Sequence, residues 1–341
     1  MFQVIILSLV SIVFFSEPLW AFTTHHFYRA SFFPEEPRYA TNNLSTLKLR
    51  LAGGNTHSSF DCSGCRKELW AVDNFISQEL CQAGIPAPFN CLNGEFQLFE
   101  ADLNFYQNLG ENFFLEFYLP IRQTEISTPI PVSHREKNRV QKTGLADTVL
   151  LFGLTYDYQE TEFLDFIDGS IQTGILFPTG RIKNPRNIFD FSYGYGGHYG
   201  VPLVLDLSVG VFDWVTVGLH IDSVFLLKRV RESKRILPCI NGNIASAGTY
   251  LKADHVFKGI SFGFGFSHAR KSNNNGYTND PALAHWSMTN FHFFFEYDLS
   301  ECDRWLGPRF AFIYNTPLSG KRIFRNTISG AEITLDAQWC F

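Results

Sequence analysis

Apolar and polar residues alternate with a period of two along much of this chain, and the pattern is clearest at its end. From Glu332 to the last residue, Phe341, every second side chain is apolar and most of those between are polar. Such alternation predicts a β-strand with one apolar and one polar face. The strand ends on Trp339 and Phe341, which a soluble sheet would seldom expose at an edge but which suit the aromatic girdle of a membrane barrel.

Eleven earlier segments show the same alternation, which is weaker in the fourth and fifth of them. They lie at residues 47–51, 99–105, 113–121, 147–158, 169–177, 203–211, 215–221, 247–253, 260–266, 291–297 and 310–314. Together with the last strand they predict twelve strands, and bacterial single-chain membrane barrels have even strand numbers.

The lengths of the connections predict the same architecture. Short and long connections alternate: 107–112, 212–214 and 257–259 are short, whereas 52–94, 122–146, 179–200, 228–245, 270–284 and 315–328 are long. Outer-membrane barrels have short periplasmic turns and long external loops. Because lipid offers no hydrogen-bond partners, the strands must pair in a closed sheet. We therefore predict an all-β fold, a closed antiparallel transmembrane β-barrel of about twelve strands over residues 45–341.

The composition excludes several other classes of protein. Of the 341 residues, 45% are hydrophobic, 16% aromatic and 18% charged, and 36 are phenylalanine. This chain is too apolar to be disordered. Its net charge of −5 argues against a nucleic-acid binder, which needs a basic face. No apolar run reaches the ~18 residues that a spanning helix needs, so the chain is not a helical membrane protein.

The first 21 residues are typical of a secretory signal peptide, although the usual N-terminal Lys or Arg is missing. An apolar core from Val4 to Phe15 is followed by Pro18 and by a plausible cleavage site after Ala21. The alternative is a buried N-terminal helix, but the segment has no amphipathic face. The pattern favours export.

Export and the final strand together indicate where the protein lies. We expect residues 45–341 to form the barrel in the bacterial outer membrane, surrounded by its lipid. Residues 22–44 would form a periplasmic segment or a plug. The last strand resembles that of bacterial outer-membrane barrels, whose terminal Phe is part of the assembly signal. The resemblance implies that the barrel-assembly machinery recognises Phe341.

Three further motifs resemble one group of such barrels. They are Gly144-Leu145-Ala146-Asp147 before a strand, the segment 174–180 (GILFPTG) and the segment 112–121 (NFFLEFYLPI). Together they are similar to transporter-type outer-membrane barrels, the group that includes hydrocarbon and phenol-pathway channels. Ala146 replaces a usual glycine of that group. The resemblance covers residues 97–180 and implies a passive channel for small apolar or aromatic solutes.

Charged residues on the inward face are the candidates for lining the lumen. The acidic candidates are Glu100, Asp102, Glu116, Asp206, Asp222, Asp254, Glu296, Asp298, Glu332 and Asp336, and the basic ones are Lys48, Arg50, Lys252 and Arg309. The acidic excess favours cations, because fixed charges of one sign concentrate their counter-ions. The alternative is that these charges pair and fill the lumen, since twelve strands lie between filled and open barrels. His220 shares one strand face with Asp222, which predicts a hydrogen bond in the lumen.

Seven cysteines suit an oxidising compartment better than the cytosol. The first external loop contains four of them, Cys62, Cys65, Cys81 and Cys91, and Cys239 lies in another. The last two of the four are too far apart for a common zinc motif, so we expect no metal and favour disulfides. Cys302 and Cys340 both lie on the periplasmic side and are a plausible pair. The connectivity in the loop stays open.

One segment has a possible enzymatic interpretation. Residues 265–276 (GFSHARKSNNNG) are similar to the His-x-Ser-Asn segment of outer-membrane phospholipases and lipid A deacylases. Here Ser272 follows His268 by four residues instead of two, so an extended strand would separate them by ~13 Å. The phosphate-binding, zinc-protease and serine-hydrolase motifs are absent. We therefore expect no enzyme and no cofactor.

These observations leave more than one function open. The main prediction is a porin-like channel for the passive uptake of small solutes, either apolar or aromatic compounds or cations. The first alternative is a cysteine-rich structural or adhesive barrel of the cell surface. The second is a lipid hydrolase that uses His268 and Ser272.

Overall fold

The computed structural model describes most of the strands and few of the long connections. The described residues are 44–56, 58–60, 64–68, 95–110, 112–127, 139–159, 164–181, 193–195, 197–211, 214–229, 242–273, 286–299, 308–321, 323–324 and 327–338. The predicted signal peptide, the segment 22–43 and the last three residues lie outside them. No helix in this part of the chain is long and apolar enough to cross a membrane.

The described residues form one large β-sheet. Its strands are β1 (Leu44–Thr56), β4 (Glu95–Asn108), β5 (Phe113–Ser127), β6 (Arg139–Leu145), β7 (Thr148–Gln159), β8 (Leu164–Phe177), β9 (His198–Val211), β10 (Val215–Arg229), β11 (Gly242–Phe257), β12 (Ile260–Asn273), β13 (Trp286–Asp298), β14 (Arg309–Lys321) and β16 (Thr327–Gln338). A smaller sheet contains β15 (Ile323–Phe324), β2 (Ser58–Phe60) and β3 (Arg66–Glu68).

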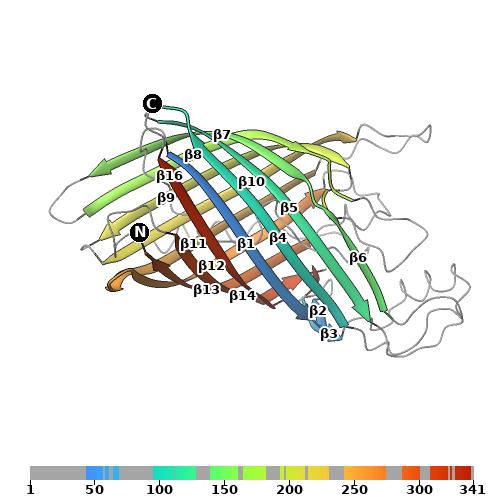
Figure 1. Ribbon diagram of the computed structural model, residues 1–341. Coiled ribbons are helices and arrows are strands. Elements are labelled where there is room, and N and C mark those ends of the chain that lie inside the picture. The colour runs from blue at the N-terminus through green and yellow to red at the C-terminus, as the bar shows by residue number, and fades with distance from the viewer. Residues whose placement is uncertain are drawn as a thin grey trace, which may run out of the picture.

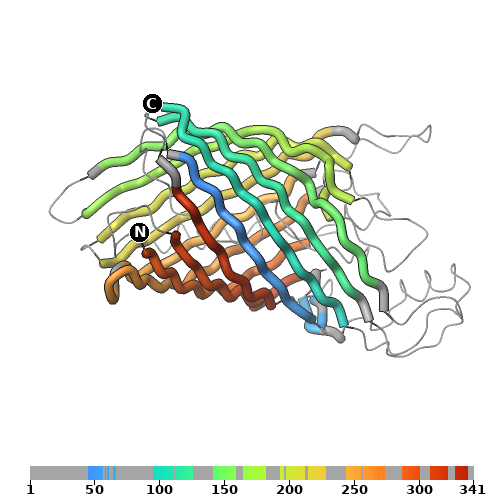
Figure 2. The backbone as a smooth tube through the Cα atoms, viewed as in Figure 1, coloured from blue at the N-terminus to red at the C-terminus, as the bar shows by residue number. Residues whose placement is uncertain are grey.

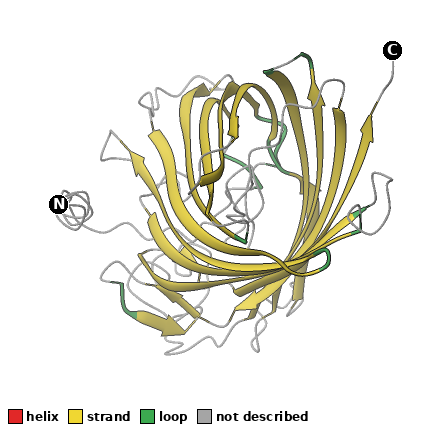
Figure 3. Ribbon diagram, turned by 90° about the vertical axis from the view of Figure 1, so that its left-hand side faces the viewer, coloured by secondary structure: helices red, strands yellow, loops and turns green. Residues whose placement is uncertain are grey.

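The large sheet closes on itself because β1 pairs with β16 on one side and with β4 on the other. β6 and β7 both pair with β5, so these two strands occupy one position in the wall and the barrel has twelve positions. Neighbouring strands are antiparallel throughout and incline around the barrel (Figures 1 and 2), and a view turned by 90° shows the ring that they form (Figure 3). The predicted closed antiparallel barrel of twelve strands is confirmed.

Side chains alternate between the outside and the interior of the barrel. On β1, Leu47, Leu49 and Leu51 are 39–44% exposed, whereas Lys48 and Arg50 between them are 9% and 5% exposed. The same alternation holds on the other long strands, so the apolar face lies outside and the polar face inside. This is the reverse of a soluble sheet and is what lipid requires.

Several strands run farther outward than the alternation predicted. The sequence indicated a loop from Arg122, but β5 continues to Ser127, and β12 continues to Asn273. In the added part of β5 the outward positions of Gln123 and Glu125 are polar, and Arg122 points inward. Beyond the apolar layer the outward side chains need not be apolar, so alternation in the sequence cannot predict this part of the strand. Its backbone ladder to β4 nonetheless continues unbroken.

The wall is interrupted between β6 and β7, which the sequence did not predict. Ala146 donates from its N–H to the carbonyl of Pro120 at 2.9 Å, but proline has no N–H to return. The hydroxyl of Thr179 donates to the Ala146 carbonyl instead, at 2.9 Å. Beyond this point Arg181 donates to Leu145 at 3.0 Å, and farther out β6 has no strand partner on that edge among the described residues.

Candidate solute site in the barrel interior

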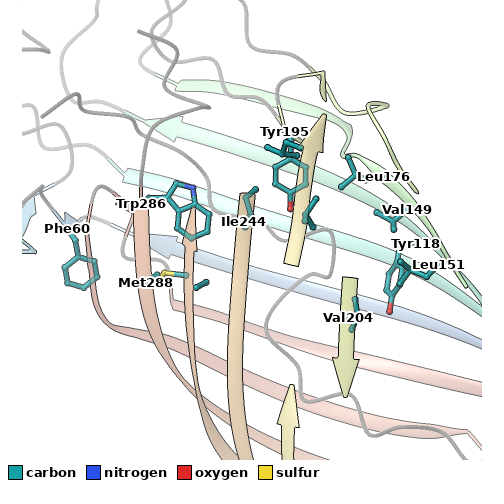
Figure 4. Packing of buried hydrophobic residues seen from close by; sticks show 13 residues of the cluster. Phe60, Tyr118, Val149, Leu151, Leu176, Tyr195, Val204, Ile244, Trp286 and Met288 are labelled. Atoms are coloured by element: carbon teal, nitrogen blue, oxygen red, sulfur yellow. The ribbon is translucent and has the colours of Figure 1, made fainter. Parts of the chain in front are cut away.

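The interior of the barrel contains a cluster of buried apolar side chains. Most of them point inward from β7 to β13 in the outer half of the barrel, and Phe60 joins them from the small sheet. The apolar cluster consists of Phe60, Tyr118, Val149, Leu151, Leu176, Tyr195, Val204, Val224, Leu226, Ile244, Ala269, Trp286 and Met288 (Figure 4).

Strand register brings these side chains together. Val149 pairs with Leu176, Val224 with Ile244, and Ala269 with Met288. Each such pair lies on the same inward face because opposed residues of neighbouring strands share a face. The interior surface that results has both aliphatic and aromatic members.

A polar belt lies next to the apolar cluster on the same strands. His220 Nδ1 bonds to Asp206, and its Nε2 lies 3.9 Å from Asp222 Oδ2. Ser170 and Gln172 also donate to Asp206 Oδ2, at 3.3 and 3.4 Å. The three predicted lumen residues of this belt are therefore buried together, with His220 hydrogen-bonded to Asp206 and within ion-pair distance of Asp222.

The opposite side of the interior is a charged wall formed by β16, β1, β4 and β5. It consists of Lys48, Arg50, Glu100, Asp102, Glu116, Arg122 and Glu332, all of which are at most 9% exposed. Arg50 Nη2 lies 2.6 Å from Glu332 Oε2, and Arg122 Nε lies 2.6 Å from Glu100 Oε1. Acidic and basic groups thus face each other at close range, and Arg122 is a member that the sequence placed in a loop.

A third group lies toward the periplasmic end. Lys252 Nζ is 3.0 Å from Asp254 Oδ1 and 2.9 Å from Glu296 Oε2. Asp298 ends β13 as a half-buried residue opposite Arg309. Of the fourteen charged residues predicted to line the lumen, thirteen lie in one of these three groups or beside it. The fourteenth, Asp336, is ion-paired with Arg309 at 3.0 Å.

Two aromatic rings lie in the interior between the polar belt and the periplasmic end. The ring of Tyr250 lies against Gly218, and that of Phe294 lies against Gly263, where a side chain would collide with it. The two rings meet edge to face with centroids 6.1 Å apart. These aromatic side chains occupy interior space that glycine leaves free.

The chain that follows β8 turns into the interior and is held there by Asp147. The carboxylate is 2% exposed and accepts hydrogen bonds from the N–H groups of Gly180 at 2.8 Å and Tyr195 at 2.6 Å. A Cβ on Gly180 or Gly194 would collide with this carboxylate, which explains both glycines. The two motifs Gly144–Asp147 and 174–180 thus meet at one junction, and Tyr195 enters the apolar cluster from it.

Tyr193 fixes the same inward turn from the other side. Its carbonyl accepts from Arg122 Nη1 at 3.0 Å, and its hydroxyl donates to the carbonyl of Lys142 at 2.7 Å. Thr124 exchanges a further bond with that hydroxyl at 2.8 Å. Residues 193–195 are consequently part of the interior surface and bonded to β5 and β6.

Sequence reasoning placed the charged residues on the inward face but missed the apolar cluster. The signal was present, since Val204 lies in the same inward row as Asp206 and Ser208. Val224 lies just beyond the predicted strand 215–221, and Ile244 lies in the predicted loop 228–245; both are inward positions of β10 and β11. Most inward positions are polar, so an apolar residue at an inward position is the signal that could have predicted the apolar cluster.

Comparison with known proteins supports the fold. No protein-family model and no curated protein matches the chain. A crystal structure of an outer membrane channel from Pseudomonas putida F1 matches with a TM-score of 0.61 and 12% identity, over 90% of this chain and 100% of that chain. The fold is that of a bacterial outer-membrane barrel. The predicted location in the outer membrane is accordingly confirmed.

Other barrels match this outer-membrane barrel more weakly. The β domain of the Bordetella autotransporter BrkA gives a TM-score of 0.41 at 8% identity, over 87% of this chain and 100% of that chain. The Pseudomonas putida toluene transporter TodX gives 0.35 at 11% identity, over 87% of this chain and 89% of that chain. Likenesses at this level support no argument about function.

The hydrolase interpretation does not fit the geometry of the outer-membrane barrel. β12 stays extended from His268 to Ser272, and both side chains lie on its outward side. His268 Nδ1 bonds to the hydroxyl of Thr289 at 2.9 Å, and Ser272 bonds to Asn243. The nucleophile and the base that such chemistry needs do not meet.

The cysteine predictions are not tested by the barrel. Cys65 is described and exposed, near the start of β3. The remaining candidates, Cys62, Cys81, Cys91, Cys302 and Cys340, lie outside the described residues. Their disulfides stay a prediction. The same holds for recognition of Phe341 by the assembly machinery.

Proposed function

We propose that this outer-membrane barrel is a channel for the passive uptake of small apolar or aromatic solutes. The observation that carries the proposal is the apolar cluster, which places Trp286, Tyr195 and aliphatic side chains on the inner face of a membrane barrel. Apolar residues inside such a barrel contact neither lipid nor, where they are covered, water. A small apolar solute is the ligand that this surface suits.

The magnitude of the expected binding suits transport. A single aromatic ring presents about 150–250 Å² of surface, so its burial at about 25 cal/mol per Å² contributes about 4–6 kcal/mol. Part of this free energy is offset because the bound solute loses translational and rotational freedom. The resulting affinity is no better than about millimolar. Weak binding lets a solute enter and leave, which a channel requires.

The charges of the interior support apolar solutes over cations. Glu100 and Glu332 are ion-paired with arginines, and Lys252 bridges two carboxylates, so much of the acidic excess is neutralised locally. Asp102 is buried, and neither of its carboxylate oxygens has a hydrogen-bond partner among the described residues. Both oxygens are shielded from the lumen, so this carboxyl group adds little to its attraction for cations.

The proposal is tested by uptake of labelled toluene into cells that lack their own hydrocarbon channels. Cells are the right system because a glycolipid outer leaflet slows apolar molecules that cross simple bilayers freely. Expression of the barrel should raise uptake several-fold, and Trp286→Ala should lower it. Trp214→Ala is the matched control, because Trp214 is 60% exposed at a periplasmic turn.

Other outcomes would favour other functions. Cation-selective conductance in planar bilayers without any effect on toluene uptake would support the acidic-lumen channel instead. Absence of both conductance and uptake, with loss of cell adhesion after deletion of the loop 69–94, would support the surface protein. Equal uptake by Trp286→Ala and wild type would refute a role for the apolar cluster.

A further inference from the structure

The outward surface of the barrel changes from apolar to polar at the outer ends of β16, β1, β4 and β5. These four strands lie side by side in Figure 1. The last apolar row across these strands is Ala331, Leu51, Ala101 and Ile121, which are paired in register. One step farther out the row is Ser329, Gly53, Phe99 and Gln123, and the next is Thr327, Asn55, Gln97 and Glu125. Lipid-facing apolar side chains thus give way to a polar outward surface.

This surface is hollowed into an outer groove of about 480 Å³. It is lined by Gly53, Gly54, Asn55, Gln97, Leu98, Phe99, Gln123, Glu125, Thr327 and Ser329. The volume lies in the ~300–1,000 Å³ range of small-molecule sites. The hollow exists because Gly53 has no side chain beside the ring of Phe99, which is 46% exposed.

The chemistry of the outer groove matches a sugar ring. A sugar has an apolar face of C–H groups and a rim of hydroxyls, so it needs an aromatic surface bordered by planar donors and acceptors. Phe99 supplies the surface, and the amides of Asn55, Gln97 and Gln123 supply the border. Gln123 Oε1 accepts from Thr143 at 3.4 Å, so its amide nitrogen is the atom that can donate to a ligand.

The charge of the outer groove excludes the simplest alternative, a lipid phosphate. None of its described lining residues is Lys or Arg, and Glu125 is acidic. An anion would find no counter-charge among these described residues. Neutral hydroxyls, in contrast, can exchange hydrogen bonds with the side-chain amides of Asn55, Gln97 and Gln123.

We propose that the outer groove binds a sugar ring in the headgroup of an outer-leaflet glycolipid. A glycolipid is the occupant, and not a free glycan, because the outer groove is continuous with the apolar row of Leu51 and Ile121, along which acyl chains lie. A lipid seated there has its sugar against Phe99 and its chains against this row. The site is separate from the apolar cluster of the interior.

The test measures binding of deep-rough lipopolysaccharide to the full-length barrel in detergent. Gly53→Leu should weaken binding at least about tenfold, because a Cβ there has ordinary contacts, 3.5 Å from the Leu98 carbonyl and 3.8 Å from Phe99, and the side chain fills the groove. Gly169→Leu is the matched control. Gly169 also faces outward and would have its nearest contacts at 3.7 and 3.8 Å, but it lies on β8, away from the groove.

A second variant removes the hydrogen-bonding border without changing a glycine. Gln97→Ala combined with Gln123→Ala should weaken binding to a similar extent and leave the folded, heat-modifiable gel form intact. Unchanged binding by both this variant and Gly53→Leu would overturn the proposal. Equal competition by phosphatidylethanolamine would show that no sugar is recognised, and equal binding of the deacylated core oligosaccharide would show that the occupant is not a lipid; either result also overturns it.

Discussion

Replacing Asp147 by alanine removes the acceptor that holds two backbone N–H groups inside the barrel. The carboxylate is buried and bonds to Gly180 N at 2.8 Å and Tyr195 N at 2.6 Å. In Asp147→Ala both donors lose their partner in a place that water reaches poorly. The inward turn at residues 193–195 then keeps the bonds of Tyr193 to β5 and β6 but loses those of the Asp147 carboxylate.

The magnitude follows from the two lost bonds. Each buried donor left without a partner costs about 1–3 kcal/mol, so the free energy of opening this segment should fall by about 2–6 kcal/mol. Since about 1.4 kcal/mol is a factor of ten, amide exchange in the segment should accelerate at least about 25-fold. Asp147→Asn retains one acceptor oxygen and should lie between alanine and wild type.

Hydrogen exchange followed by mass spectrometry in detergent measures this effect on peptides that contain residues 193–195. Asp157→Ala is the control, since Asp157 is an exposed carboxylate on the same strand. Planar-bilayer conductance is the second readout, because release of Tyr195 from the apolar cluster should raise it. Exchange in Asp147→Ala at the wild-type rate would refute the reasoning that this carboxylate holds the turn.

Three further predictions concern charges and the rejected hydrolase. Glu332→Gln leaves Arg50 without its carboxylate at 2.6 Å, so the reversal potential in a KCl gradient should move toward anions; an unchanged potential would count against a conducting path along the charged wall. Arg122→Gln breaks a buried ion pair and should cost about 3–5 kcal/mol of unfolding free energy. Arg309→Gln, whose side chain is 40% exposed, should cost under about 1 kcal/mol in the same denaturant titration, and equal costs would contradict the burial argument. Ser272→Ala should leave the acylation pattern of outer-membrane lipids unchanged, and an altered pattern would revive the hydrolase.

The barrel could be predicted from the sequence because one physical constraint acts on every residue of its wall. Lipid outside and polar groups inside force Leu47 and Lys48 to opposite faces, and the same rule repeats along each strand. Strand number and loop asymmetry follow from counting those repeats. The outer part of β5 was not predicted as a strand because it lies beyond the apolar layer. The rule does not apply there.

The interior could be predicted only in part. Alternation assigns Val204 to the inward face, but which inward residues meet depends on register between strands that are distant in sequence. The bonds of Asp147 to Gly180 and Tyr195 span 33 and 48 residues, and no local pattern encodes them. The motif resemblance marked both ends of this junction without showing that they touch.

Among the described residues, one edge of β6 has no strand partner, and this has a consequence for the surrounding bilayer. Hydrocarbon cannot satisfy an unpaired strand edge, so on this flank the oily layer must end near Leu145, in the same register row as Leu51 and Ala331. That row runs across the strands, which tilt by about 40° in a barrel, and it spans four spacings of about 4.8 Å. Its height therefore changes by about 12 Å from one end to the other. The outer boundary of the apolar surface is therefore inclined to the barrel axis. Either the outer leaflet is thinner beside β6, or the whole barrel is tilted in the membrane.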